Sequence, residues 1–345
     1  MLKTLLDLSI EELKEEIAKI DSSKFRYKQI YSWLQKGASF DEMSNIPKNL
    51  RDTLKENYIT GHAEIYTKLV SKIDGTIKYL FRLYDGVLIE GVLMPYDYGN
   101  TFCMSTQAGC NMACGFCSSA IDNKTRDLTD GDMLAQAIAV VRDIGGDRPI
   151  NNIVLMGSGE PFDNYDNTIR FLQRINSQES LNVGYRSISL STCGLVDRMY
   201  DFSKENIPVT MCISLHAGND ETRKKIMPIA NKYSIADTIK ACREYFNATG
   251  RRIIIEYVLI AGVNDDKKNA EDLSKAIRGL NCNVNVIRLN AGREGFLPTD
   301  KKATNSFLKA LQDNKVKAIL RRSMGSDING ACGQLRHNVI AGEDK

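Results

Sequence analysis

The feature that most constrains the fold is an alternation of short apolar runs and helical stretches, which continues for about 240 residues after Tyr98. Such alternation is typical of an α/β fold, in which helices cover a parallel sheet that is either open or closed into a barrel. We expect strands at residues 102–105, 153–156, 187–191, 209–215, 253–260, 284–289 and 316–320. We expect helices at residues 131–144, 167–174, 235–246, 272–279 and 305–313.

The N-terminal part of the chain follows different patterns. The first 60 residues have helical spacing, and Ser9-Ile10-Glu11-Glu12 is typical of a capping box at a helix start. From Glu64 the apolar period changes to two, and Asp74-Gly75 and Asp85-Gly86 indicate tight turns, so a short antiparallel meander follows. We therefore divide the chain into residues 1–85, helices plus meander, and residues 86–345, the alternating α/β region.

Composition narrows the class of protein. The apolar runs are interrupted within about six residues, whereas a membrane span needs about 20, and the N-terminus lacks a signal-peptide pattern. We therefore expect a cytoplasmic protein with no membrane partner. Nine cysteines in such a chain suggest metal ligation or catalysis rather than a disulfide framework. The net charge of +3 favours an anionic partner only weakly.

The spacing of Cys110, Cys114 and Cys117 carries the strongest chemical signal. Three thiolates in one short loop can hold an iron–sulfur cluster and leave one iron open, because such clusters normally take four cysteines. Zinc is the alternative metal, but structural zinc sites use four protein ligands. A ferredoxin-like site would require a further cysteine close by, which Ser118-Ser119-Ala120 does not supply. We therefore favour a cluster over zinc.

Polar residues follow several of the predicted strands. Taken singly, each is more simply explained as the satisfied polar end of a buried strand. Because the carboxyl ends of parallel strands meet at one edge of the sheet, we expect these residues to gather there. They are Gly157, Gly159 and Glu160 after one strand, then Ser191, then Ser214-Leu215-His216, then Asn290.

Two isolated cysteines complete the candidate set. Cys103 lies on the first strand of the α/β region, where a buried small apolar residue is the simpler interpretation. Cys332 lies in the small-residue segment Asn329-Gly330-Ala331-Cys332-Gly333, which favours a reactive thiol at least as strongly as a structural one.

Cys110, Cys114, Phe116 and Cys117 resemble the hallmark of the radical S-adenosylmethionine (SAM) superfamily, Cys-x-x-x-Cys-x-x-Cys with an aromatic residue before the third cysteine. The resemblance implies a partial (β/α) radical-SAM barrel, here with an N-terminal helical accessory domain and the short meander. It also implies a 4Fe-4S cluster on the three cysteines. SAM would chelate the open iron, and Gly159 and Glu160 would match the element that contacts its amino group.

The whole set of motifs is similar to the RlmN/Cfr family of RNA adenosine methyltransferases, over nearly the entire chain. The resemblance implies that Gly159, Glu160, Ser191, Ser214, Leu215, His216 and Asn290 bind SAM. It implies that Cys332 carries a methyl group and becomes linked to the RNA through it. Cys103 would release the RNA from this covalent adduct by forming a disulfide with Cys332, and Glu90 would accept the ring proton. A solvated carboxylate is the alternative interpretation of Glu90.

Activity and partners follow from the same resemblance. It implies methylation of adenine carbon 2 in 23S rRNA and in the tRNA adenosine 3′ of the anticodon, with a reductant such as flavodoxin or ferredoxin. Methylation of carbon 8, as in Cfr, and a radical enzyme acting on another substrate are the alternatives. An Fe–S electron carrier would leave the strand-end residues unexplained.

Two basic segments are candidates for RNA contact, with a solvated helix face as the alternative for each. The first combines cations and aromatic rings: Lys24, Phe25, Arg26, Tyr27, Lys28, Tyr31, Trp33 and Lys36. The second is Lys315, Lys317, Arg321 and Arg322.

Overall fold

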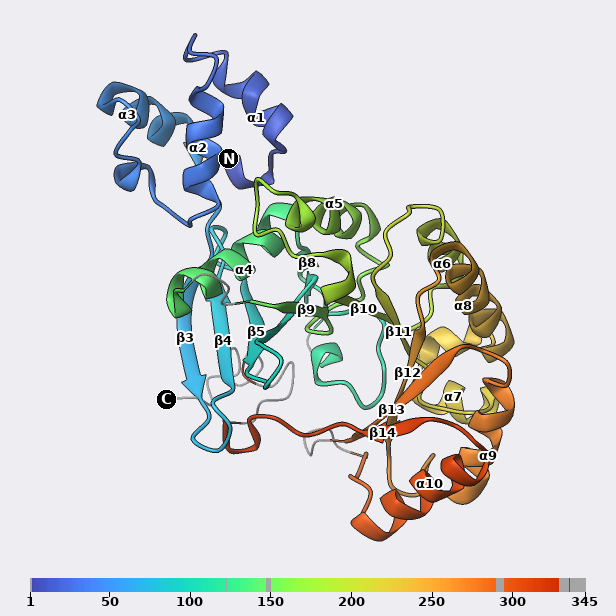
Figure 1. The fold of residues 1–345 in the computed structure, drawn as a ribbon. Helices are drawn as coiled ribbons and strands as arrows, with labels where there is room; N and C mark the ends of the chain where they lie inside the picture. Colours follow the sequence, from blue (N-terminus) through green and yellow to red (C-terminus); the bar gives the residue numbers. More distant parts are fainter. Residues whose placement is uncertain (1, 122, 147–149, 290–294, 329–334, 336–345) are drawn as a thin grey trace.

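A single open sheet organises the molecule (Figure 1). The computed structural model describes residues 2–121, 123–146, 150–289, 295–328 and 335. Ten strands pair in the order β14-β13-β12-β11-β10-β9-β6-β5-β4-β3. The strands from β14 to β6 in this order run parallel, so the predicted α/β fold is confirmed. They are β6 (Thr101–Met104), β9 (Asn152–Leu155), β10 (Ile188–Thr192), β11 (Thr210–Ser214), β12 (Ile253–Leu259), β13 (Cys282–Arg288) and β14 (Ala318–Leu320).

Helices cover the outer face of the parallel strands (Figure 1). Several begin at residues that cap the helix, because the side chains of Thr129, Ser234, Asp266 and Asp300 accept hydrogen bonds from backbone N–H groups of the first turn. The two seven-residue helices α6 and α7 were not predicted, since they are too short for a helical period. The set is α4 (Asp130–Ile144), α5 (Tyr165–Asn176), α6 (Val196–Phe202), α7 (Asp220–Ile226), α8 (Ile235–Thr249), α9 (Lys267–Ala276) and α10 (Lys301–Asp313).

The predicted meander extends the same sheet. Strands β3 (Glu64–Val70), β4 (Ile77–Arg82) and β5 (Leu88–Met94) pair antiparallel, and β5 continues antiparallel onto β6. Gly75 and Gly86, in the two predicted turns, have positive φ angles of 74° and 84°. A boundary after residue 85 falls in the turn between β4 and β5, and the division of the chain at this point stays a prediction.

The segment after β14 links the two edges of the sheet. It passes from β14 to the turn between β3 and β4 (Figure 1). There the N–H of Gly325 donates to Asp74 at 2.9 Å. The carboxylate of Asp327 accepts from the Ser71 hydroxyl at 2.6 Å and from the Lys72 N–H at 2.9 Å. Strands β3 and β14 are the two edge strands of the sheet, and in the described part of the chain they do not pair with each other. The contacts of Asp74 and Asp327 therefore connect the two edges in place of a strand ladder.

The N-terminal helices form a small layer of their own. Helices α1 (Ile10–Ile17), α2 (Arg26–Leu34) and α3 (Lys48–Asn57) bury an apolar interior, and the predicted capping box is present at Ser9. The two ends of this segment are joined, because β1 (Lys3–Thr4) pairs with β2 (Tyr58–Ile59). No helix of the described residues has the length and apolar character needed to cross a membrane.

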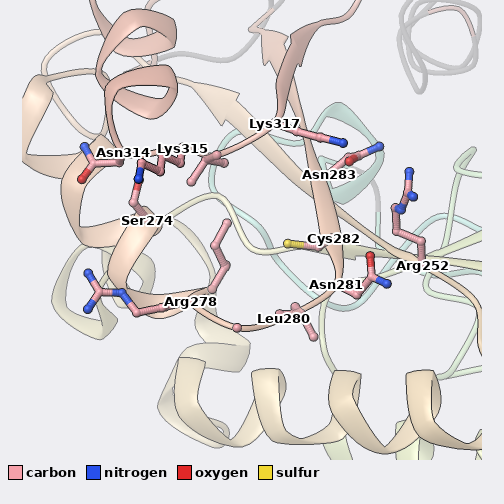
Figure 2. A pocket seen from close by; sticks show the side chains of 13 residues that line it. Arg252, Ser274, Arg278, Leu280, Asn281, Cys282, Asn283, Asn314, Lys315 and Lys317 are labelled. Atoms are coloured by element: carbon pink, nitrogen blue, oxygen red, sulfur yellow. The ribbon is translucent and has the colours of Figure 1, made fainter.

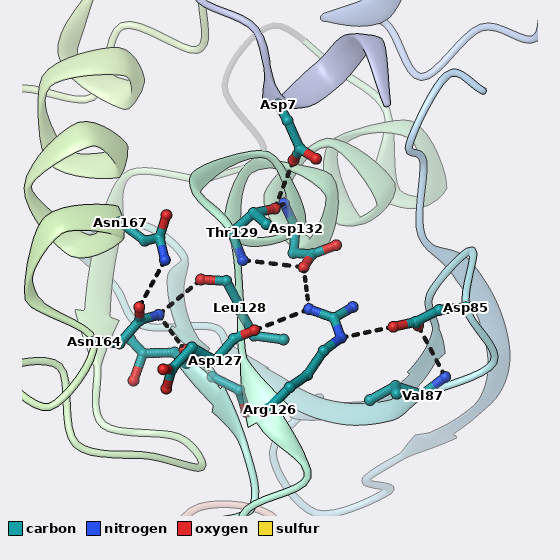
Figure 3. A network of polar contacts seen from close by, with 12 residues as sticks. Asp7, Asp85, Val87, Arg126, Asp127, Leu128, Thr129, Asp132, Asn164 and Asn167 are labelled. Carbon is teal, nitrogen blue, oxygen red and sulfur yellow. Dashed lines mark hydrogen bonds and ion pairs between the residues drawn. The ribbon is translucent and has the colours of Figure 1, made fainter. Parts of the chain in front are cut away.

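A polar network fastens this layer to the start of α4 (Figure 3). The Thr129 hydroxyl donates to Asp7 at 2.5 Å, and Arg126 binds both Asp132 and Asp85 at 2.6 Å. The fit at Gly131 is close, since a Cβ there would lie 2.2 Å from the Asp7 carboxylate oxygen and 2.8 Å from its backbone nitrogen. The N-terminal layer is therefore packed directly against the α/β region.

The Asp7 carboxyl gives this junction a pH dependence. Burial raises its pKa from 3.8 to about 6, and the neighbouring Asp132 and Asp130 add to the effect. Between pH 3.8 and pH 6 the folded protein therefore keeps the Asp7 proton, whereas the unfolded chain has lost it. The contribution of this proton to stability is complete below pH 3.8 and disappears as the pH rises through 6. A shift of this size corresponds to at most about 3 kcal/mol.

We expect Asp7→Asn to remove most of this pH dependence, because the amide cannot ionise. Urea unfolding at pH 5 and pH 8 measures it: the loss of stability on going to pH 8 should be larger for wild type than for the variant. Equal losses in the two proteins would contradict the assignment.

Candidate active site

The inner face of the sheet carries the predicted site. Outward side chains such as Leu155 and Leu190 are buried under the helices, whereas the alternate positions of the same strands point inward. A cavity of about 480 Å³ also lies on this face, toward the amino ends of the strands, and none of the predicted site residues that the structure describes lines it. Its lining includes Met156, Ser189, Cys212 and Arg321.

The three cysteines lie on a loop whose two ends are held together. Strand β7 (Gln107–Ala108) leads into the loop, and β8 (Arg126–Asp127), after it, pairs antiparallel with β7. Gly109 has a φ angle of 86°, and a Cβ there would lie 2.6 Å from the carbonyl oxygen of Asn123. The backbone N–H of Gly115 donates to Ile226 at 2.8 Å, which ties the loop to the end of α7.

The donor set of this loop fits an iron–sulfur cluster. Burial raises the pKa of Cys110 to about 12 and that of Cys114 further, and the neighbouring Cys117 adds to both shifts. Crowded, half-buried thiols ionise only when a cation lies beside them. A bound metal is such a cation, and the thiols that ligate it lose their protons. Among the described residues no three donor side chains already converge on one metal position. The loop thus carries the three ligands within eight residues of sequence, and a cluster would set their final geometry.

A second loop packs directly against the first. Backbone N–H groups of Thr106 and Gln107 donate to the carbonyl of Ser158 at 2.9 and 3.1 Å. Gly157 and Gly159 permit the contact, because a Cβ on either would lie 2.6 Å from atoms of residues 104 and 107. The Gly-rich element after β9 is therefore adjacent to the start of the cysteine loop, as the sequence predicts.

Glu160 is buried at the end of this loop, with 4% of its surface exposed. One carboxylate oxygen accepts from the N–H of Phe162 at 3.1 Å and the other from the N–H of Cys193 at 2.7 Å. Burial raises its pKa, although both hydrogen bonds favour the ionised form. The side chains of Thr192 and Cys193 also hydrogen-bond to this carboxylate, so an ammonium group at Glu160 would share its acceptor positions with donors of the protein.

Ser191, Ser214, Leu215 and His216 come together at the ends of β10 and β11. The two serine hydroxyl oxygens lie 3.3 Å apart, and Leu215 is fully buried. His216 adopts a φ angle of 56°, which is unusual for a residue with a side chain and costs on the order of 1–3 kcal/mol. Its ring meets Phe116 of the cysteine loop edge to face at 4.9 Å, so these strand ends contact the loop.

Glu90 and Cys103 lie on the same inner face, at the junction of the antiparallel and parallel strands. Cys103 pairs with Val92, and the Ser105 hydroxyl donates to the carbonyl of Glu90 at 2.8 Å. Glu90 is 3% exposed and forms an ion pair of 3.6 Å with Lys78, which is fully buried. The alternative of a solvated carboxylate is therefore excluded, and the role of Glu90 as proton acceptor stays a prediction.

The structure adds residues that the sequence analysis missed, and it leaves two predicted ones undescribed. Asn290 and Cys332 lie outside the described residues. Glu256, in the middle of β12, and Arg321 both enter the inner face and pair at 3.4 Å. A charged residue inside the apolar run of β12 was the available signal for Glu256, whereas Arg321 was assigned to a basic cluster for RNA contact.

The two basic segments that are candidates for RNA contact lie in different surroundings. Arg26 is held by Asp21 and Gln29, and Tyr31 is buried, which leaves Lys24, Phe25, Lys28 and Lys36 exposed on or beside α2. Lys315 and Lys317 line a separate pocket of about 360 Å³ together with Arg252 and Arg278 (Figure 2). This pocket lies at the amino ends of β12 and β13, the opposite end of the strands from the predicted site.

The fold and the site together define a radical SAM enzyme, and the comparisons agree. Residues 104–273 match the radical SAM superfamily, and residues 3–59 match the ribosomal RNA large subunit methyltransferase N-terminal domain. A radical SAM methyltransferase from Sphaerobacter thermophilus superimposes with a TM-score of 0.91 at 40% identity, covering 96% of this chain and 98% of that one.

Similar proteins match this chain over almost its full length. A probable dual-specificity RNA methyltransferase RlmN from Clostridium acetobutylicum is 47% identical over 98% of both chains. One from Clostridioides difficile is 48% identical over 96% of this chain and 97% of its own. The chain belongs to the RlmN family of radical SAM RNA methyltransferases.

We expect the His216 imidazole to remain neutral from pH 5 to pH 8. Burial lowers its pKa to about 3, and Arg223 adds to the effect. Its Nδ1 accepts from the N–H of Val258 at 3.1 Å, so Nε2 carries the proton. Ring ¹⁵N chemical shifts across this pH range test the expectation, with His216→Asn to assign the signals. A titration midpoint near 6.5 would show that the ring is accessible to water.

Proposed function

We propose that this enzyme methylates carbon 2 of an adenosine in 23S rRNA and of the adenosine 3′ of the anticodon in tRNA. The observation that carries the proposal is the contact between the cysteine loop and the Gly157–Glu160 loop at one edge of the sheet, in a chain that matches RlmN relatives from end to end. Partners would be both RNAs and a one-electron reductant such as flavodoxin or ferredoxin.

The cofactors would be a 4Fe-4S cluster on Cys110, Cys114 and Cys117, and SAM on Gly159, Glu160, Ser191, Ser214, Leu215, His216 and Asn290. When bound, this pair supplies both a methyl group and, after one-electron reduction, a carbon radical able to remove a hydrogen atom. Glu160 would accept hydrogen bonds from the ammonium group of SAM. The buried surroundings of Leu215 and His216 would exclude water from the adenosine part.

Protein residues would carry the remaining steps. Adenine carbon 2 is a poor nucleophile, whereas a thiolate accepts a methyl group readily, so Cys332 would be methylated first and then linked to the ring through that carbon. Glu90, which pairs with Lys78, would take the ring proton. Once the adduct has given up its unpaired electron to the cluster, Cys103 would attack the sulfur of Cys332, so that a disulfide forms and the sulfur–carbon bond breaks. The released carbon would take up a proton, and the RNA would leave with a methyl group. A reducing cytosol can regenerate both thiols.

The two cysteines should fail in different ways. Cys332→Ala has no atom that accepts the methyl group, so mass spectrometry should find neither methylcysteine nor an RNA adduct. Cys103→Ala should still form the adduct but not release it, so RNA-linked protein should accumulate. Nuclease should shorten the attached RNA. Thiol reductants should not release it, because the bond that joins it to the protein is a thioether.

Wild-type protein, reconstituted anaerobically and supplied with rRNA and tRNA fragments, provides the control. Nucleoside analysis should yield 2-methyladenosine. Formation of 8-methyladenosine would overturn the proposed position on the ring, and normal turnover by Cys103→Ala would overturn the two-cysteine assignment.

The exposed cations near α2 should contact RNA phosphate. We expect the change of Lys24, Lys28 and Lys36 to Glu to weaken RNA binding and to lower the salt dependence of log Kd by up to about 2 to 3. The same change at Lys301, Lys302 and Lys309, which are exposed on α10, is the matched control. Equal losses for both variants would indicate a general charge effect rather than a binding surface.

A further inference from the structure

Glu256 contacts the predicted SAM site through its side chain. It lies in β12 and is 5% exposed, on the inner face of the sheet. The Ser191 hydroxyl donates to one of its carboxylate oxygens at 2.8 Å, and the Ser214 hydroxyl lies 3.3 Å from that of Ser191. The carboxylate therefore fixes the direction of a hydroxyl group in the predicted cofactor site.

The backbone of Glu256 holds the rest of the same site. Its carbonyl accepts from the N–H groups of Leu215 and His216, both at 3.2 Å. These bonds, together with the one from Val258 to the His216 ring, maintain the left-handed backbone of His216. Leu215 and His216, which follow β11, thus bond directly to Glu256, and Ser214 at the end of β11 is linked to its side chain through Ser191.

A counter-charge makes this arrangement stable. A buried carboxylate without a partner is strongly unfavourable. Arg321, in the segment after β14, supplies the partner at 3.4 Å and also contacts the sulfur of Met156 at 3.8 Å. Arg321 therefore reaches across the inner face to the strand that precedes the Gly157–Glu160 loop.

We propose that Glu256 is a positioning residue for SAM: it orients Ser191 and the β11 strand end, and Arg321 neutralises it so that the carboxylate can remain buried at the site. The inference rests on the proposed function, because it assumes that this site binds SAM. Its test measures SAM affinity directly and does not depend on turnover.

Equilibrium dialysis of reconstituted holoenzyme with radiolabelled SAM gives the Kd. We expect Glu256→Ala to raise it about tenfold or more, since the acceptor of Ser191 is lost. Glu256→Gln should change it much less, because the amide oxygen can still accept from Ser191. Asn285→Ala is the matched control, since Asn285 pairs with Glu256 in the sheet and its side chain does not hydrogen-bond to Ser191, Ser214 or His216 among the described residues.

A double variant separates positioning from simple stabilisation. Glu256→Met with Arg321→Met removes both charges, so thermal stability should recover relative to Glu256→Met alone while the weak SAM binding persists. Wild-type Kd values for Glu256→Ala, or recovery of affinity in the double variant, would overturn the inference alone. Absence of SAM binding by the wild-type holoenzyme would instead overturn the proposed function, and the inference with it.

Discussion

Strand β6 pairs antiparallel with β5 on one side and parallel with β9 on the other, and the arrangement of the site depends on these two ladders. They join the meander to the α/β region in one sheet. They also place Cys103 and Glu90 on the inner face that the strand ends β9 to β13 share. A shift of one residue in either ladder would turn Cys103 toward the helices, because side chains alternate along a strand.

The inner face carries two ion pairs whose carboxylates are buried. Lys78 with Glu90, and Arg321 with Glu256, form ion pairs in a region where apolar side chains would pack at least as well. In each pair one residue is a carboxylate in or beside the predicted site. Each of these two carboxylates is therefore held by a cation of the protein on the inner face.

The sequence predicted the parallel strands, most helices, the meander and the cysteine loop, because each depends on local spacing. Residues 253–260 and 284–289, for example, were assigned within a residue or two of β12 and β13. It did not predict α6 and α7, which are short, or the pairing of Glu256 with Arg321, which joins residues 65 positions apart. Arg321 was grouped with a basic cluster for RNA contact because the sequence just after a short edge strand does not show which side chains turn inward.

The segment that links the sheet edges has a mechanical consequence. A closed barrel resists widening through a full ladder of hydrogen bonds, whereas here the circumference is completed by a few contacts of Asp74 and Asp327 between residues about 255 positions apart. Such a joint can part while every strand remains paired. Among the described residues the two edges of the sheet are thus held together by contacts of two aspartates, and breaking them would leave every strand ladder intact.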